Sequence, residues 1–228
     1  MTGPTLNVQP LDTSTSFRTQ VYHALKQAIT EMDIYDHKTE IRLDERQVSE
    51  KLGVSRTPIR EAMTLLEQEG FVRSQPRRGI FVIRKTKREI LEMVTVWAAL
   101  ESMAARIITE TAADKDIAKL RKMFSEFEGD DVRAHIDEYS DANIRFHEAI
   151  ISLSGNQLIA DIIEGLFMHV RAIRARTIHE ADRVTRSIVD HMHIIEALEA
   201  RNTDLAAKLV REHTLNLRVH VEESVALE

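Results

Sequence analysis

Ten histidines occur in the chain, and eight of them come after residue 130. A single histidine on a helix is usually a surface residue or a hydrogen-bonded core residue. Several histidines on the buried faces of different helices indicate another chemistry, because neutral imidazole is a frequent ligand of transition-metal ions. The test is whether the spacing of the apolar residues turns these side chains toward one interior.

Asn143 and His147 stand four residues apart on one predicted helical face, together with Ile150, so one cation can contact both side chains. A later helix is predicted to bury the apolar stripe that contains His191. His193 points away from that stripe, because two residues rotate a helix by about 200°.

The last predicted helix carries His213 on its buried stripe with Val210 and Leu217. His220 shares that stripe but lies about 10 Å further along the helix axis, too far from His213 to bind the same ion. Four side chains from three helices are therefore expected to converge: Asn143, His147, His191 and His213. Three imidazoles and one amide oxygen predict a divalent metal, zinc first, with nickel or another transition metal as alternatives.

Four more side chains of the helical part are candidates for contact with a ligand: Trp97, His169, Arg171 and Asn216. Each also has an ordinary structural interpretation. Trp97 and His169 can instead pack or hydrogen-bond within the core. Arg171, like Arg174, can pair with an acid or remain solvated, and Asn216 lies one helical turn from the last ligand.

A second kind of chemistry is indicated near residue 50. A short helix capped by Asp44 and ended by Gly53, then a second helix from Ser55, has the form of a helix–turn–helix. In that geometry the first residues of the second helix face base edges in the major groove. They are Ser55, Arg56, Thr57 and Arg60. Arginine suits guanine, and hydroxyl groups suit phosphate.

Residues 71–73 and 79–84 flank a PRRG turn and predict a short hairpin, which contains the only strands expected in the chain. The tip of this hairpin, Arg77, Arg78 and Gly79, is expected to form a basic wing whose glycine allows close approach to DNA. The alternative is an ordinary surface helix with solvated arginines. Two arginines, a capping serine and an adjoining basic wing favour DNA binding.

Charge separates the chain into two parts, although the whole has a net charge of −6. Residues 42–88 contain 12 Lys and Arg against 6 Asp and Glu, whereas residues 89–228 contain 16 against 26. The basic part is suited to a polyanion. The absence of cysteine excludes disulfides and thiolate ligands. No apolar run approaches the roughly 18 residues of a membrane span, and no signal peptide is visible, so a cytoplasmic protein without a membrane partner is expected.

The elements that must position these residues form a mainly α-helical fold with two domains. We expect a loose arm at 1–14 and a winged helix-turn-helix DNA-binding domain at 15–85. An all-α bundle is expected at 88–228, and it contains the predicted metal ligands. Helical periodicity and break signals place about six helices in this bundle. They lie near 87–111, 114–128, 131–154, 157–178, 183–201 and 203–224.

Residues 16–84 contain a specific series: Leu43, Glu45 and Val48, the run LGVSRTPIREA at 52–62, Leu66, Glu67, Glu69 and Gly70, and RRG at 77–79. This series closely resembles the winged helix of GntR-type transcriptional regulators. The resemblance implies that DNA is contacted by an arginine of the first motif helix, here Arg46. It implies further contacts through Ser55, Arg56, Thr57, Arg60 and the wing glycine, Gly79.

The helical part contains NIRFH at 143–147, DHMHIIEA at 190–197 and the later His213. These resemble the ligand motifs of the FCD effector domain, found in the FadR-like branch of GntR regulators. The resemblance implies a divalent metal in a helical cavity with an organic acid beside it. The bundle at 88–228 is then expected to serve effector binding, metal binding and dimerisation. The candidate effector-binding residues are Trp97, His169, Arg171 and Asn216. Asn143 stands where the family commonly has Asp, and Trp97 stands where it usually has Arg. The effector carboxylate is therefore expected to be held differently, or the effector to be larger and partly aromatic.

The leading hypothesis is a transcriptional regulator, most simply a repressor, that responds to a metal and a small carboxylate. It would bind a palindromic operator as a homodimer, because one recognition helix reads only a few base pairs. The alternatives are a metal-dependent hydrolytic enzyme fused to a DNA-binding domain and a constitutive architectural DNA binder. No HExxH motif is present, and Glu148 follows His147 directly and so points off the metal face, which favours a non-enzymatic protein.

Overall fold

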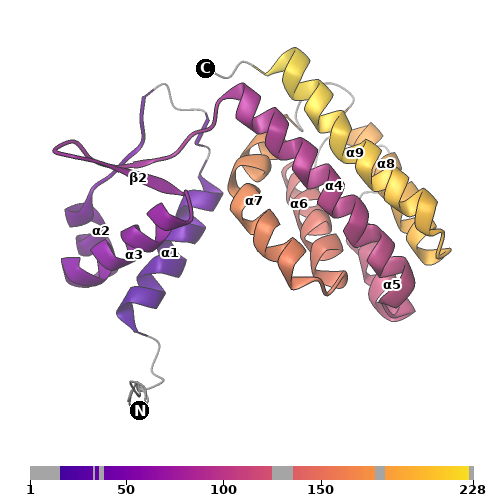
Figure 1. Ribbon diagram of the computed structural model, residues 1–228, viewed down its shortest axis with the longest axis horizontal. Helices are drawn as coiled ribbons and strands as arrows, with labels where there is room; N and C mark the ends of the chain where they lie inside the picture. The colour runs from indigo at the N-terminus through magenta and orange to yellow at the C-terminus, as the bar shows by residue number, and fades with distance from the viewer. Residues whose placement is uncertain (1–15, 33, 36–38, 125–135, 178–182, 226–228) are drawn as a thin grey trace, which may run out of the picture. The chain divides into compact units, whose positions relative to one another are not determined.

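The computed structural model describes residues 16–32, 34–35, 39–124, 136–177 and 183–225 of the chain (Figure 1). The chain forms two compact units. The first contains Met1–Ala28 and Arg42–Phe81, and the second contains Ile29–Ile41 and Val82–Glu228. Each unit is described by itself below.

The first unit is a winged helix-turn-helix. Its helices are α1 (Phe17–Glu31), α2 (Glu45–Leu52) and α3 (Arg56–Gln68), and its strands are β1 (Arg42–Leu43), β2 (Val72–Gln75) and β3 (Gly79–Val82). The strands form a sheet in the order β1-β3-β2. The apolar stripe of α3 is buried, with Ile59 and Leu66 fully inaccessible to solvent, so α3 is fixed against the core while its other face remains free.

The hairpin of β2 and β3 is present as expected, but the expectation that it held the only strands was wrong. β1 pairs antiparallel with β3, so that Arg42 lies opposite Phe81 and Leu43 opposite Ile80. Two residues are too few to show the alternation that identifies a strand in a sequence. This strand exists only because β3 supplies its hydrogen-bonding partner.

Local capping signals define the turn of the helix–turn–helix. The Asp44 side chain accepts hydrogen bonds from the N–H groups of Arg46 and Gln47, and Gly53 ends α2 with a positive φ of 66°. Both features follow from the sequence. Ser55 occupies the N-cap position of α3, but its side chain makes no capping hydrogen bond. Its hydroxyl is therefore available at the start of the recognition helix.

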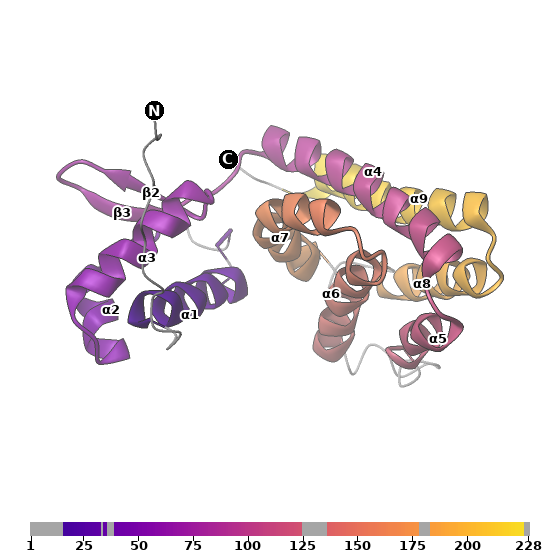
Figure 2. The ribbon, with the colours of Figure 1, turned by 60° about the horizontal axis from the view of Figure 1, so that its bottom comes forward.

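The second unit contains six helices within the described residues. They are α4 (Lys87–Thr111), α5 (Asp114–Lys122), α6 (Ile136–Leu153), α7 (Gln157–Thr177), α8 (Arg183–Glu199) and α9 (Thr203–Ser224). α4 runs alongside α9 and also packs against α6 and α7 (Figures 1 and 2). The expected fold class, a winged helix-turn-helix followed by an all-α bundle, is confirmed.

The helix expected over 114–128 is shorter than predicted. α5 ends at Lys122, where the N–H groups of Met123 and Phe124 turn to carbonyls only three residues back. This tightening buries Phe124 against the rings of Phe146 and His191. Residues 125–128 of the expected helix, and residues 131–135 of the next one, lie outside the described residues.

Large side chains in the core of the helical unit surround its buried polar groups. Trp97, Phe124, Tyr139 and Phe146 are each at most 1% exposed. Burial of such aromatic side chains contributes most of the driving force for packing a helical domain. Among the helices that the structure describes, none is long and apolar enough to cross a membrane.

The segment Ile29–Ile41 belongs to the helical unit, and Tyr35 packs against the core of that unit. Ile34 is fully buried. The Tyr35 hydroxyl lies 2.8 Å from Nδ1 of His169 on α7 and accepts a hydrogen bond from the backbone N–H of Lys85. Because that N–H already donates to the hydroxyl oxygen, the hydroxyl proton is available to a neutral His169. Burial lowers the pKa of His169 from 6.5 to about 4.

This buried histidine should make the protein sensitive to acid. As the pH falls below 6.5, His169 becomes protonated in the unfolded chain, whereas in the folded chain it stays neutral until about pH 4. The free energy of unfolding therefore decreases across that interval. We expect the His169 contribution to fall by about 2 kcal/mol between pH 7 and pH 5. His169→Gln should therefore show a smaller acid-induced loss in urea unfolding than the wild type. The exposed His193→Gln serves as control, and an equal loss in the wild type and both variants would contradict the assignment.

Candidate DNA-binding surface and metal centre

The recognition helix presents its expected residues to solvent. Ser55, Arg56, Thr57 and Arg60 are all exposed, on the side of α3 opposite its buried stripe. Nε of Arg60 lies 2.8 Å from a carboxylate oxygen of Glu45, and Nε of Arg46 lies 2.9 Å from one of Glu50. Exposed ion pairs of this kind contribute only about 0–1 kcal/mol, so both arginines can exchange their glutamates for DNA at little cost.

The wing is a tight turn between β2 and β3. Arg77 adopts a positive φ of 64° and Gly79 one of 116°. The guanidinium of Arg78 lies over the ring of Phe81, with 5.6 Å between its central carbon and the ring centroid. Arg77 and Arg78 are both exposed. The structure therefore places the three predicted wing residues at one exposed tip.

Sequence reasoning missed Arg42, which lies beside the wing. It lines a hollow of about 280 Å³ together with Arg46, Arg56 and Gly79. A Cβ on Gly79 would come within 2.8 Å of Nε of Arg42, so the glycine makes room for that side chain. The only signal in the sequence was that Arg42 belongs to the basic segment; its position depends on the pairing of β1 with β3.

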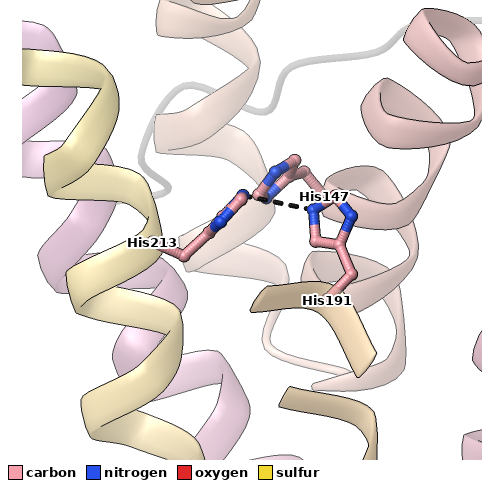
Figure 3. Close-up of side chains that lie close together, drawn as sticks. All are labelled: His147, His191 and His213. Carbon is pink, nitrogen blue, oxygen red and sulfur yellow. Dashed lines mark hydrogen bonds between the residues drawn. The ribbon is translucent and has the colours of Figure 1, made fainter. Parts of the chain in front are cut away.

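In the helical unit, the structure brings together three of the four predicted metal ligands, from α6, α8 and α9. His147, His191 and His213 are buried, and the candidate ligand nitrogens lie within 4.8 Å of one another (Figure 3). Nε2 of His191 and Nε2 of His213 are 3.1 Å apart. Two nitrogens that each lie about 2.0–2.1 Å from one ion are separated by about 2.9–3.4 Å, for angles of about 90–109° at the ion.

Each of these histidines has its other ring nitrogen held by a polar partner. Nδ1 of His147 contacts Oε1 of Glu101, and Nδ1 of His213 lies 3.0 Å from Oδ2 of Asp190. A carboxylate only accepts hydrogen bonds, so both Nδ1 atoms carry the proton and both Nε2 atoms present a lone pair. Nδ1 of His191 lies 3.2 Å from the hydroxyl of Tyr139. Carboxylate–histidine pairs of this kind orient metal ligands in proteins.

The donor set fits a divalent transition metal. Burial lowers the pKa of His147 and of His191 well below that of a free imidazole, so both are neutral and able to coordinate at neutral pH. Asn143, the fourth predicted ligand, is also buried, and its Oδ1 has no hydrogen-bond partner among the described residues. A buried amide oxygen without a donor is costly unless a cation satisfies it.

The sequence assigned no role to Glu101 and left two interpretations open for Arg174, but both residues belong to the centre. Glu101 is fully buried, accepts a hydrogen bond from the hydroxyl of Thr214 at 2.6 Å, and contacts His147. Burial raises the pKa of its carboxyl, and the Arg174 guanidinium opposes that rise. Arg174 is also buried, with Nη1 2.7 Å from Nε2 of His147, while its Nε and Nη2 atoms have no partner in the described part of the chain.

A cavity of about 420 Å³ adjoins the centre. Asn143, His213 and Arg174 line it, so it reaches two of the four predicted ligands and the buried guanidinium. Asn216, one of the predicted effector-binding residues, lines it as well. Arg183 and Arg186 add two more cationic side chains to its wall.

The other three predicted effector residues do not line this cavity. Trp97 is buried, with its ring stacked on Phe167 at 5.8 Å, and it borders a separate hollow of about 450 Å³. His169 contacts Tyr35, as described above. Arg171 is half-buried and lies close enough to Glu148 to lower the pKa of that carboxyl, against the effect of burial.

The chain joins a winged helix-turn-helix to a helical domain with a buried polar centre. This combination defines the protein as a transcriptional regulator of the two-domain type. The chain belongs to the GntR family of bacterial regulatory proteins and carries an FCD domain. Residues 17–82 match the model of the family described as "Bacterial regulatory proteins, gntR family", and residues 92–216 match that of the FCD domain. Members of the GntR family of regulators bind DNA.

Curated relatives agree with this assignment. The Uxu operon regulator of Haemophilus influenzae is 30% identical over 78% of this chain and 73% of its own length. The gluconate operon transcriptional repressor of Bacillus licheniformis is 26% identical, over 79% of this chain and 76% of its own. The solved structure of Escherichia coli McbR/YncC has a TM-score of 0.74 at 22% identity, covers 91% of this chain and 98% of its own, and shows the shared fold. The chain is therefore a regulator and not an enzyme.

The recognition helix yields a first mutational prediction. Arg60→Ala should weaken operator binding by about 1–3 kcal/mol and relax sequence preference, because a base contact is lost. Arg77→Ala should weaken binding to all sequences alike, because we expect its contact to be with phosphate. Gel shifts with the operator and with a scrambled duplex measure both effects. Unaltered operator affinity in Arg60→Ala would contradict the assignment of the recognition helix.

The metal centre yields a second mutational prediction. Purified protein should contain about one divalent ion per chain, and His191→Ala should lose it because one of three imidazoles is removed. His193→Ala is the matched control, since its side chain is exposed on the opposite face of the same helix. Elemental analysis of both variants measures the number of divalent ions bound per chain. Equal metal loss in the two would exclude the proposed ligand set.

Proposed function

We propose that this chain is a cytoplasmic repressor whose helical domain binds a divalent metal, zinc first, and a small carboxylate that releases the protein from its operator. The operator is a palindrome bound by a homodimer, with Arg46, Ser55, Arg56, Thr57, Arg60, Arg77, Arg78 and Gly79 at the DNA interface. Repression is supported by the relative from Bacillus licheniformis, which is named as a transcriptional repressor.

The observation that carries the metal proposal is the orientation of the histidines. Glu101 and Asp190 hold the Nδ1 atoms of His147 and His213, so their Nε2 lone pairs are directed to the space shared with His191. A bound divalent cation would replace Arg174 as the partner of Nε2 of His147 and would satisfy the oxygen of Asn143, which has no partner among the described residues. It would act there as a Lewis acid that also attracts an anionic ligand.

Charge at the centre favours an anionic effector. With Glu101 and Asp190 ionised, these two carboxylates, Arg174 and a divalent ion together carry a net charge of +1, and Arg183 and Arg186 in the cavity wall add to it. A buried excess charge needs a counter-charge. The adjoining cavity offers the free Nε and Nη2 atoms of Arg174, and a guanidinium binds a carboxylate with two parallel hydrogen bonds.

The effector signal has a direct covalent route toward the DNA-binding unit. Glu101 lies on α4, and α4 begins at Lys87, shortly after the last strand of the wing. An acid that draws Arg174 away from Glu101 would therefore act on the helix to which the wing is attached. We propose that this changes the spacing of the two recognition helices in the dimer. The duplex fixes the spacing of its half-sites, so such a change releases DNA.

Asn143→Asp tests this proposal. The added negative charge should tighten zinc binding and weaken acid binding, because it cancels the charge that attracts the acid. Calorimetric titration of zinc into metal-free protein, and then of acetate, succinate and citrate into the zinc-loaded protein, measures both affinities. We expect at least one of these acids to bind the wild type.

Asn156→Asp is the matched control for that experiment. Asn156 lies outside the centre, and its side-chain oxygen accepts a hydrogen bond from the N–H of Ile159, which an aspartate preserves. Neither affinity should change in this variant. Unchanged or tighter acid binding in Asn143→Asp would mean that the acid does not meet the metal charge, and the effector site would then lie elsewhere.

A further inference from the structure

We propose that Arg42 binds a phosphate of the DNA backbone, in the hollow between the wing and the start of the recognition helix. The inference rests on DNA binding by the winged helix and adds a residue that the sequence did not indicate. The hollow of about 280 Å³ is lined by Arg42, Leu43, Asp44, Glu45, Arg46, Arg56, Gly79 and Ile80. All of these belong to the first unit.

The acidic side chains of this hollow are already engaged. Both capping hydrogen bonds of α2 end on Oδ1 of Asp44, and these bonds are the main cause of its lowered pKa. Glu45 pairs with Arg60 at 2.8 Å, and Arg46 pairs with Glu50, a residue outside the hollow, at 2.9 Å. The negative charge of the hollow is therefore directed mainly to the helix end and to Arg60, while Asp44 also attracts Arg42 and Arg46 without a hydrogen bond to either side chain.

Two arginines of the hollow, Arg42 and Arg56, are not used in these ion pairs. Arg42 and Arg56 are exposed, and neither makes a hydrogen bond or an ion pair with another described residue. A guanidinium has five N–H donors in a planar fork that matches the oxygens of a phosphate. Two such groups around one concave surface present donors to an anion that sits between them.

Backbone geometry holds Arg42 in place before DNA arrives. Its pairing with Phe81 in the β1–β3 ladder fixes the origin of the side chain directly beside the wing. The guanidinium end then passes Gly79 so closely that a Cβ there would lie 2.8 Å from Nε. Less freedom is therefore lost when this side chain binds than for an arginine that projects into solvent.

The position of Arg42 favours phosphate over a base. It comes from a strand beside the wing, whereas base edges are reached from the first residues of the helix that enters the groove. The N–H groups at the start of α3 also favour an anion nearby. A side chain placed between wing and helix start therefore meets the sugar–phosphate backbone that flanks the groove.

Arg42→Gln tests the inference, because glutamine keeps the polarity of the side chain while removing its charge. We expect affinity to fall on the order of tenfold, to the same extent for a random-sequence 30-bp duplex and for an operator selected from a random pool. The slope of log K against log salt concentration should become shallower by about 0.9 per bound chain. Fluorescence anisotropy over a series of salt concentrations measures all three quantities.

Lys51→Ala is the charge-matched control, since Lys51 is exposed in the last turn of α2, at the end away from Arg46. It should leave the slope unchanged. Arg42→Lys, which keeps the charge, should recover most of the slope, and equal melting temperatures would show that the variants are folded. A wild-type slope in Arg42→Gln, with Arg60→Ala still impaired, would overturn the phosphate contact but not DNA binding. A loss confined to the selected operator would overturn it in favour of a base contact.

Discussion

A carboxylate that is fully removed from water needs hydrogen-bond donors and a counter-charge, and Glu101 imposes that requirement on the helical unit. Its partners come from three other helices: His147 from α6, Arg174 from α7 and Thr214 from α9. Four helices must therefore pack in one register. Loss of any partner would leave a buried polar group unsatisfied, at a cost of about 1–3 kcal/mol or more.

The same requirement sets the chemistry of the centre. Because Nδ1 of His147 is committed to Glu101, its Nε2 faces the interior, where Arg174 lies 2.7 Å away. An ion entering this space meets a guanidinium that is already there. Repulsion between the two cations would turn Arg174 toward the adjoining cavity, and an anion could then bind to both positive centres. Metal binding and anion binding would thereby be thermodynamically coupled.

In the DNA-binding unit, by contrast, the functional charged residues are exposed and not buried. The arginines of its two motif helices lie on the surface, and Arg46 and Arg60 are paired with glutamates near solvent. Such pairs are weak and screened by salt, so they hold the side chains near their working positions and yield to phosphates and bases. The polar groups of the helical unit are therefore held by buried partners, whereas the arginines of the DNA-binding unit can exchange theirs for DNA.

Local patterns in the sequence determined where the helices lie and which faces they bury, and they located the Asp44 and Gly53 ends of α2. They did not determine the end of α5 or the free hydroxyl of Ser55. Periodicity alone separated His191, which is buried, from His193, which is exposed. The tertiary structure alone decided which groups meet across the chain: Glu101 with His147, and Arg42 with Gly79. The reason is physical. A helical period fixes the direction of a side chain about its own axis, whereas the partner it meets depends on the packing of elements far apart in the sequence.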